Sequence, residues 1–280
     1  SWAQQMIQGA NRMYFISRIK QDLLAGNSFI GMIGTFNTVE SDHILSIDGM
    51  TNLFNNQIGI DGQVVMTSNQ KKGIFGNISY KPLGYFSTWI DYHLYEKDFN
   101  LNHLGYLWRD DYSQIKLGLE FQYPEQWGFI RNSAIIFEAD KENNLQGVDL
   151  GKTIELNYDI QFTKFGGIGG GFYHIIDHYD DRKIIYNYEN NIFGVPIYIP
   201  EVTGSHFYLS SDKHQKLSGQ VSWTWASNPR NDMELGRYLE LIYKPNSYLT
   251  FSTSYDRYLL DKQFHWLESF IEWNEESQAF

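Results

Sequence analysis

The sequence predicts an all-β fold, an antiparallel up-and-down transmembrane β-barrel, from three observations. Apolar and polar residues alternate over segments longer than ordinary strands, and we count roughly fourteen to sixteen such segments. Aromatic residues make up 17% of the chain. No stretch approaches the roughly 18 consecutive apolar residues that a membrane-spanning helix needs. These 280 residues are expected to form an incomplete barrel.

The composition suits a barrel wall. Tyr (20) and Phe (19) lead the aromatic residues, the charged fraction is 20%, and the mean hydropathy is −0.42. In a barrel one face of each strand meets lipid and the other meets water, and Tyr and Trp lie where the two environments join. The predicted environment of the chain is therefore a bacterial outer membrane and its lipid bilayer.

The chain opens with Ser1-Trp2-Ala3-Gln4-Gln5, which has neither the basic nor the apolar region of a signal peptide. About the first 12 residues are expected to be a linker or an incomplete strand. The C-terminal residues after Trp273 lack a long closing strand. Because no linker or shift in composition divides the chain, we expect residues 1–280 to be a single barrel domain, and a fragment of one.

The clearest strands alternate without an error. Within Gln114–Tyr123 the apolar set runs from Ile115 to Tyr123 in steps of two, and Thr153–Thr163 repeats the pattern. These lengths match the nine to eleven residues of a tilted outer-membrane strand, whereas strands of soluble proteins average about five or six. Further segments, some of them weaker, lie at Phe29–Thr38, Ile58–Met66, Phe86–Leu94, Phe129–Ala139, Leu217–Trp225, Leu249–Asp256 and Phe264–Trp273.

The predicted connections alternate between tight and long, as they do when the two rims of a barrel face different compartments. Tight candidates include Asn55-Asn56 and Lys164–Gly167. Long candidates are Glu96–Asp111, Asp140–Leu150, Asp177–Lys183 and Tyr188–Ser205.

The lack of cysteine and the acidic net charge limit the chemistry that the chain can perform. The chain has no cysteine, which excludes disulfides, thiolate zinc sites and cysteine nucleophiles. The formal net charge of −11 argues against a nucleic-acid partner, because phosphate binding needs a concentrated basic surface. No cofactor is expected.

Two passages carry a family resemblance. The first is Phe15–Asp22 followed by Asn27–Gly31 and Ile58–Gly62, and the second is Asp98–Tyr112, with its Phe, Leu-Gly-aromatic and Arg-Asp pattern. Together they resemble an outer-membrane β-barrel family of unassigned function in Gram-negative bacteria. Its members usually carry, ahead of the barrel, a periplasmic domain similar to a family-nine carbohydrate-binding module. The resemblance implies a fragment of that barrel and no catalytic residues.

Polar residues that alternate with the apolar set are candidates for the barrel lumen. They would keep the interior polar, and the sharper alternative is selectivity for a passing solute. The sequence leaves both readings open. The candidates are Lys116, Glu120, Glu138, Glu155, Asp159, Gln161 and Glu240.

Aromatic residues in the predicted loops or at strand ends have two interpretations. Membrane-interface girdles place Trp and Tyr there for structural reasons, and the same rings stack on sugars in binding loops. The girdle is the favoured interpretation, and a saccharide partner is the alternative. The candidates are Tyr106, Trp108, Tyr112 and Trp127.

Three further motifs point weakly to chemistry. His174, Asp177, His178, Asp180 and Asp181 gather metal-ligand types, but exposed loops gather the same residues, and we expect no metal site. The glycine run 166–171 lacks the third fingerprint glycine, and we expect close packing rather than nucleotide binding. Carboxylate pairs such as Glu120 and Glu138 arise by chance in so acidic a chain, so enzyme activity is not expected.

The sequence therefore favours an outer-membrane barrel acting in transport, anchoring or surface display, linked to carbohydrate use by the resemblance alone. The first rival is a soluble secreted β-sandwich or propeller that binds or hydrolyses glycans. The second is a structural or assembly barrel that conducts nothing. Neither the solute nor the oligomeric state can be read from the sequence.

Overall fold

The computed structural model describes residues 2–7, 10–38, 43–101, 107–183, 185–187, 192–230 and 232–261, almost all of them in strands. The elements are β1(Trp2–Ile7), β2(Ala10–Leu23), η1(Leu24–Gly26), β3(Ser28–Asn37), β4(His43–Leu53), β5(Ile58–Thr67), β6(Lys72–Leu83), β7(Phe86–Tyr95), β8(Tyr112–Tyr123), β9(Ile130–Asn143), β10(Asp149–Phe162), β11(Gly167–Ile175), β12(His178–Asp180), β13(Ile185–Asn187), β14(Ile192–Phe193), β15(Ile197–Ile199), β16(Val202–Ser210), β17(Leu217–Ser227), β18(Met233–Asn246) and β19(Leu249–Asp261). The helical segments among these residues have neither the length nor the apolar character for crossing a bilayer.

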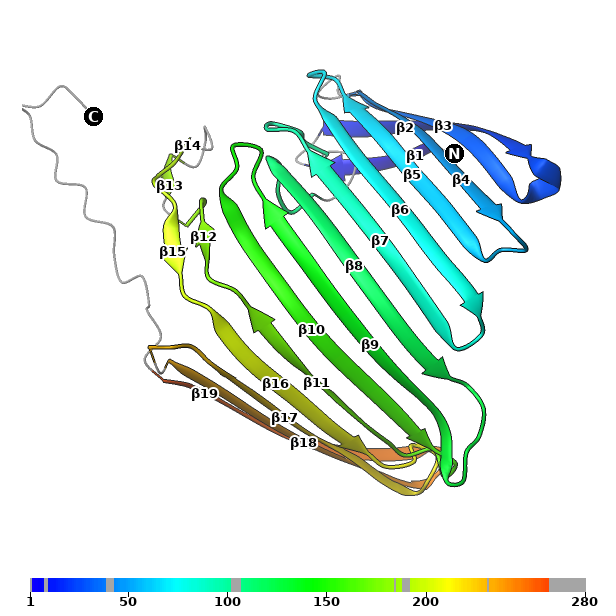
Figure 1. Cartoon of the computed structure of the whole chain (residues 1–280), viewed down its shortest axis with the longest axis vertical. Helices are drawn as coiled ribbons and strands as arrows, with labels where there is room; N and C mark the ends of the chain where they lie inside the picture. Colours follow the sequence, from blue (N-terminus) through cyan, green and yellow to red (C-terminus); the bar gives the residue numbers. More distant parts are fainter. Residues whose placement is uncertain are drawn as a thin grey trace, which may run out of the picture.

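Fifteen strands form one antiparallel sheet in which each strand pairs with its neighbours in the sequence (Figure 1). The one interruption is between β11 and β16, which pair directly, while β12–β15 form two small ladders in the connection between them. This confirms the all-β, antiparallel up-and-down prediction and the expected number of strands. The sheet is tilted and curled but not closed, and its described edges are β1 and β19. The first strand, β1, spans Trp2–Ile7 and pairs with β2.

The connections define two different rims. Along one rim, which we call the turn rim, all connections are short: 24–27, 54–57, 84–85, 124–129, 163–166, 211–216 and 247–248. The opposite rim, which we call the loop rim, carries both long connections, 96–111 and 176–201. The predicted long connection Glu96–Asp111 is observed, and Asp177–Lys183 lies within the other long one, but the predicted alternation holds only there, because 68–71 and 144–148 on the loop rim are as short as the turns. The predicted long connection Asp140–Leu150 is wrong, and Tyr188–Ser205 extends too far, because β16 begins at Val202. β9 continues to Asn143 and β10 begins at Asp149, because Asn144 closes a tight turn by accepting hydrogen bonds from the backbone of Gln146 and Val148.

The strand register keeps the alternation in phase across the sheet. Lys116 lies opposite Asp91 on one side and Asp140 on the other, whereas its neighbour Leu117 lies opposite Ile90 and Ala139. Since directly opposite residues point to the same side of a sheet, the charged residues gather on one face and the apolar residues on the other. We call these the polar face and the apolar face.

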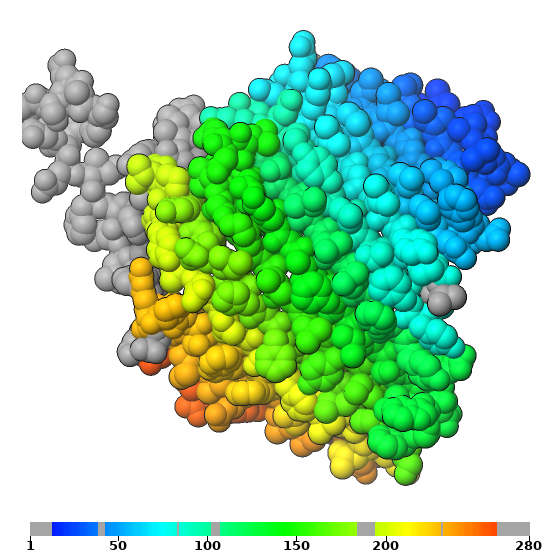
Figure 2. Space-filling view, viewed as in Figure 1, coloured from blue at the N-terminus to red at the C-terminus, as the bar shows by residue number. Residues whose placement is uncertain are grey.

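The sheet is a single layer among the described residues. Apart from sequence-adjacent elements and β11 with β16, the packed pairs of elements are β12 against β10 and β15. In Figure 2 the strands follow one another across the visible surface, and no other described segment lies over them. Side chains of the apolar face are consequently open to the surroundings, as for Phe121 (59% exposed) and Ile135 (51%). A two-layered sandwich would have covered them.

Large rings lie over glycines on the polar face. A Cβ atom at Gly118 would fall inside the indole of Trp89, and one at Gly169 would meet the Tyr208 ring. This explains two glycines of the run 166–171, because Gly169 and Gly171 leave room for Tyr208, Asn157 and His206. Aromatic side chains laid across a neighbouring glycine keep a curled sheet packed where a second layer is missing.

Candidate functional site

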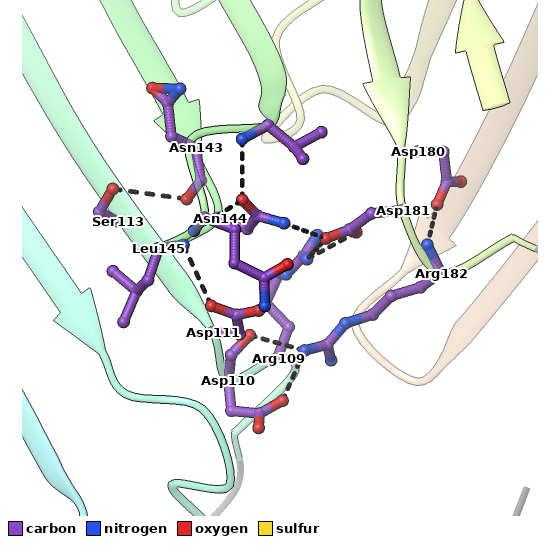
Figure 3. Close-up of polar contacts among 12 residues, drawn as sticks. Arg109, Asp110, Asp111, Ser113, Asn143, Asn144, Leu145, Asp180, Asp181 and Arg182 are labelled. Carbon is purple, nitrogen blue, oxygen red and sulfur yellow. Dashed lines mark hydrogen bonds and ion pairs between the residues drawn. The ribbon is translucent and has the colours of Figure 1, made fainter. Parts of the chain in front are cut away.

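The most elaborate polar site in the described residues lies at the loop rim, where two distant connections meet. Arg109 and Asp110 come from the β7–β8 connection, and Asp181 and Arg182 come from the β11–β16 connection. Each arginine pairs with the aspartate of the other connection (Figure 3). We call these four residues the charge clasp.

The first half of the clasp is almost buried. One terminal nitrogen of Arg109, Nη2, lies 2.8 Å from Oδ1 and 3.1 Å from Oδ2 of Asp181. The two side chains are 9% and 12% exposed. Asn144 of the β9–β10 turn also donates to Asp181, at 2.9 Å, while Arg109 Nε has no partner among the described residues. Removing either partner of so buried an ion pair is strongly destabilising, because the remaining charge then lacks a counter-ion.

The second half is more open. Arg182 Nη2 donates to the Asp110 carboxylate at 2.6 Å and to the Asp110 carbonyl at 2.7 Å. About a quarter of each side chain is exposed, so water screens this pair more than the first. The Asp180 carboxylate accepts the backbone N–H of Arg182 at 3.0 Å and holds the turn that presents the guanidinium.

A further contact ties in the β9–β10 turn. Asp111 accepts the backbone N–H of Leu145 at 3.0 Å, and Asn144 contributes the bond to Asp181 described above (Figure 3). Three connections are therefore cross-linked above the ends of β8, β9, β10 and β11. A loop rim held in this way has a fixed shape rather than independent loops.

The β7–β8 connection also folds down onto the polar face. Phe99 is 2% exposed, and a Cβ atom on Gly73 of β6 would lie 2.7 Å from its ring. Its ring stacks on Tyr95 at 5.6 Å, and Tyr95 stacks on Tyr112 at 6.2 Å. Because Gly73 and Tyr95 are directly opposite partners on the polar face, Phe99 anchors the connection on that face, not above the rim.

The three aromatic candidates that the structure describes are not gathered at one place. Trp108 is exposed and meets Tyr112 edge-on at 5.5 Å. Tyr112 is buried, and its hydroxyl donates to Glu142 at 2.6 Å, so it is presented neither to lipid nor to a ligand. Trp127 is exposed at the turn rim, at the other end of β8. Tyr106 lies outside the described residues.

The metal-ligand types of the β11–β16 connection are engaged elsewhere. Asp181 is taken by Arg109, the His178 ring contacts the carbonyl of Ile176, and His174 contacts Thr203. Asp177 hydrogen-bonds Tyr198, and partial burial together with that carboxylate raises the pKa of the Tyr198 hydroxyl. Within the described parts of the chain, no three such groups are placed to hold a metal ion.

All seven lumen candidates fall on the polar face by register. Most have a partner there: Lys116 pairs with Glu138 at 2.7 Å, Ser87 donates to Glu120 at 3.0 Å, and Asn157 donates to Glu155 at 2.8 Å. Asp159 accepts from Tyr208, and Gln161 accepts from Asn132 at 3.3 Å. Glu240 lies apart on β18, opposite Gln220. Sequence reasoning missed other members of this wall, namely Asp91, Asp140 and Glu142. Asp140 and Glu142 were missed because Asp140–Leu150 was assigned to a loop, whereas β9 continues to Asn143.

Sequence reasoning also missed the charge clasp. Its only signal is the complementary order of two dipeptides, Arg109-Asp110 and Asp181-Arg182. The sequence alone does not show that these two dipeptides meet, because their contact depends on the strand order that brings the two connections to one rim.

Comparisons with known proteins complete the description. A family model described as "Domain of unknown function (DUF5916)" matches residues 26–278. No curated protein matches the sequence significantly. Among solved structures, the chain is similar to the crystal structure of Pseudomonas aeruginosa OccK11 (OpdR). The sequence identity is 8% and the TM-score is 0.47, with 91% of this chain and 87% of that chain covered.

Proposed function

We propose that the chain, which belongs to the family described as a domain of unknown function (DUF5916), forms the wall of a transmembrane β-barrel in the outer membrane of a Gram-negative bacterium. The observation that carries the proposal is the uncovered apolar face. It extends from β2 to β19, and single apolar patches on soluble monomers rarely exceed a few hundred Å². Hydrocarbon is the partner that suits so continuous an apolar surface.

Strand length supports the same partner. β8, β9, β10 and β18 have 12 to 14 residues, enough for the nine to eleven that cross the hydrocarbon at a tilt. Both long connections lie on one rim and the other rim has short turns alone, which fits a wall with an outer side and a periplasmic side. The soluble sandwich or propeller fits this single-layered sheet poorly.

The finer proposal is transport, and it rests on the polar face. A wall of paired carboxylates, lysine and hydroxyls suits a water-filled passage, and the β7–β8 connection anchored by Phe99 would narrow that passage near the loop rim. Anchoring, surface display and a non-conducting barrel are the competing roles. Carbohydrate as the solute, and a sugar-binding-like domain ahead of the barrel, come from the family resemblance alone.

The experiment uses the absence of native cysteine. Ile135 and Ile136 are adjacent isoleucines of β9 that point to the apolar and the polar face, respectively. In lipid vesicles, a cysteine at Ile135 should resist a water-soluble maleimide while a cysteine at Ile136 reacts. Equal reaction of both cysteines would sink the membrane assignment. Current through a planar bilayer then separates transport from the silent alternatives.

A further inference from the structure

Two arginines face each other on the apolar face. Arg237 of β18 and Arg257 of β19 are directly opposite cross-strand partners, and Trp223 of β17 lies opposite Arg237 on its other side. On their own strands the arginines are flanked on this face by apolar residues, for example Leu235 and Leu239. Two cations thus lie directly opposite each other among apolar neighbours.

Neither arginine forms an ion pair with a carboxylate in the part of the chain that the structure describes. The acidic residues within three positions of either arginine, Glu234, Glu240 and Asp256, alternate onto the polar face, and both arginines are exposed. Asp261 shares the face of the arginines but lies four positions beyond Arg257. Like charges directly opposite each other destabilise a strand pair unless an anion lies between them. An external negative group between the two arginines would offset this cost.

The position of the arginines along the strands indicates where that group lies. From Arg237 to Asn246 and from Leu249 to Arg257, each strand has about the nine to eleven residues that cross the hydrocarbon. At the turn-rim end of this span, Tyr243 and Phe251 stack at 6.4 Å. The arginines and Trp223 then lie at the other boundary, on the loop-rim side, where amphipathic side chains meet headgroups.

We propose that Arg237 and Arg257 bind the phosphate of a lipid headgroup in the leaflet on the loop-rim side. The inference rests on the proposed function, since it needs the apolar face to lie in a bilayer. Guanidinium groups bind phosphate through paired N–H donors, and two of them on opposite strands can share one phosphate. A bound phosphate also removes the repulsion between the two cations.

Native mass spectrometry of the detergent-solubilised protein tests this, with cardiolipin as the phosphate-rich probe and phosphatidylcholine as the zwitterionic comparison. The double variant Arg237→Gln/Arg257→Gln should bind cardiolipin about tenfold more weakly, the effect of losing one charge-assisted contact or more. Arg131→Gln is the matched control, because Arg131 lies at the other end of the strands, next to the turn rim, with its guanidinium 4.8 Å from the centre of the Phe165 ring. The Arg131→Gln variant should bind cardiolipin with the same affinity as the native protein. The Arg→Lys pair should lose affinity only in part, since charge remains and the planar fork is lost.

Unchanged cardiolipin affinity in the double variant would overturn the inference, as would equal binding of the two lipids by the native protein. A shift from dimer to monomer on substitution would assign the arginines to an interface between copies instead. The cysteine experiment at Ile135 and Ile136 is independent of these outcomes, so failure of lipid binding and failure of membrane insertion can be told apart.

Discussion

The guanidinium of Arg109 and the carboxylate of Asp181, 72 positions apart in the sequence, form a nearly buried ion pair at 2.8 Å that joins the two longest connections of the sheet. The pair sits beside a more open one between Arg182 and Asp110. Together the two pairs fix the shape of the loop rim, and they differ enough in exposure to be separated by mutation.

Asp181→Asn should loosen the loop rim strongly. It leaves the Arg109 charge almost buried without a counter-ion, a change that costs about 3–5 kcal/mol for buried pairs. Asp110→Asn is the matched control, and it should cost no more than about 1 kcal/mol because its pair is partly exposed. Hydrogen–deuterium exchange of residues 96–101 measures the difference. Equal effects of the two substitutions would contradict the assigned roles.

Ile135→Arg should impair membrane insertion, whereas Ile136→Arg should be far milder. An arginine on the lipid-facing side near mid-strand costs about 2–4 kcal/mol, and one on the polar side can be hydrated. Leu119→Arg and Glu120→Arg on β8 repeat the comparison and should rank the same way. Unfolding by urea in lipid vesicles gives the free energies. Reversed tolerance in both pairs would show that the faces are assigned the wrong way round.

Gly118→Ala should destabilise the sheet by about 1–3 kcal/mol, the range for overpacking, because the new methyl group occupies the position of the Trp89 ring. Gly76→Ala on β6 is the control, since a Cβ atom there meets nothing within 4 Å. Tryptophan fluorescence should change in the first variant alone. A silent Gly118→Ala would mean that Trp89 does not lie across the glycine.

Asp212 should make the turn 211–216 sensitive to acid. The backbone N–H of His214 donates to its carboxylate at 2.8 Å and is the main reason that the pKa of Asp212 is lowered from its usual value of 3.8. A lowered folded-state pKa means that the stabilisation is complete above the unfolded-state pKa and is lost as pH falls through the folded-state one. Amide exchange in this turn should therefore accelerate only below about pH 4. In Asp212→Asn, amide exchange in this turn should follow only the intrinsic pH dependence of the exchange reaction. If the acceleration in acid persists in this variant, another titrating group is responsible.

Much of the fold could be predicted because alternation is a local property. A period of two over Gln114–Tyr123 indicates a strand and its two faces without any knowledge of neighbours. The polar-face positions of Lys116, Glu138 and Asp159 follow from the same rule. The boundaries of the β9–β10 turn were misjudged, because charged residues such as Asp140 and Lys141 belong as readily to a long strand as to a loop.

By itself, the sequence determined the strands, their two faces and several of the tight turns, since each of these depends on residues close together in the chain. Only the tertiary structure decided which distant side chains meet: Arg109 with Asp181, Phe99 with Gly73, and Arg237 opposite Arg257. Those contacts depend on the strand order and on the register of every strand pair between the two residues. A shift of one register by a single residue would move every side chain of that strand to the other face and break these contacts. The local alternation of apolar and polar residues would be unchanged.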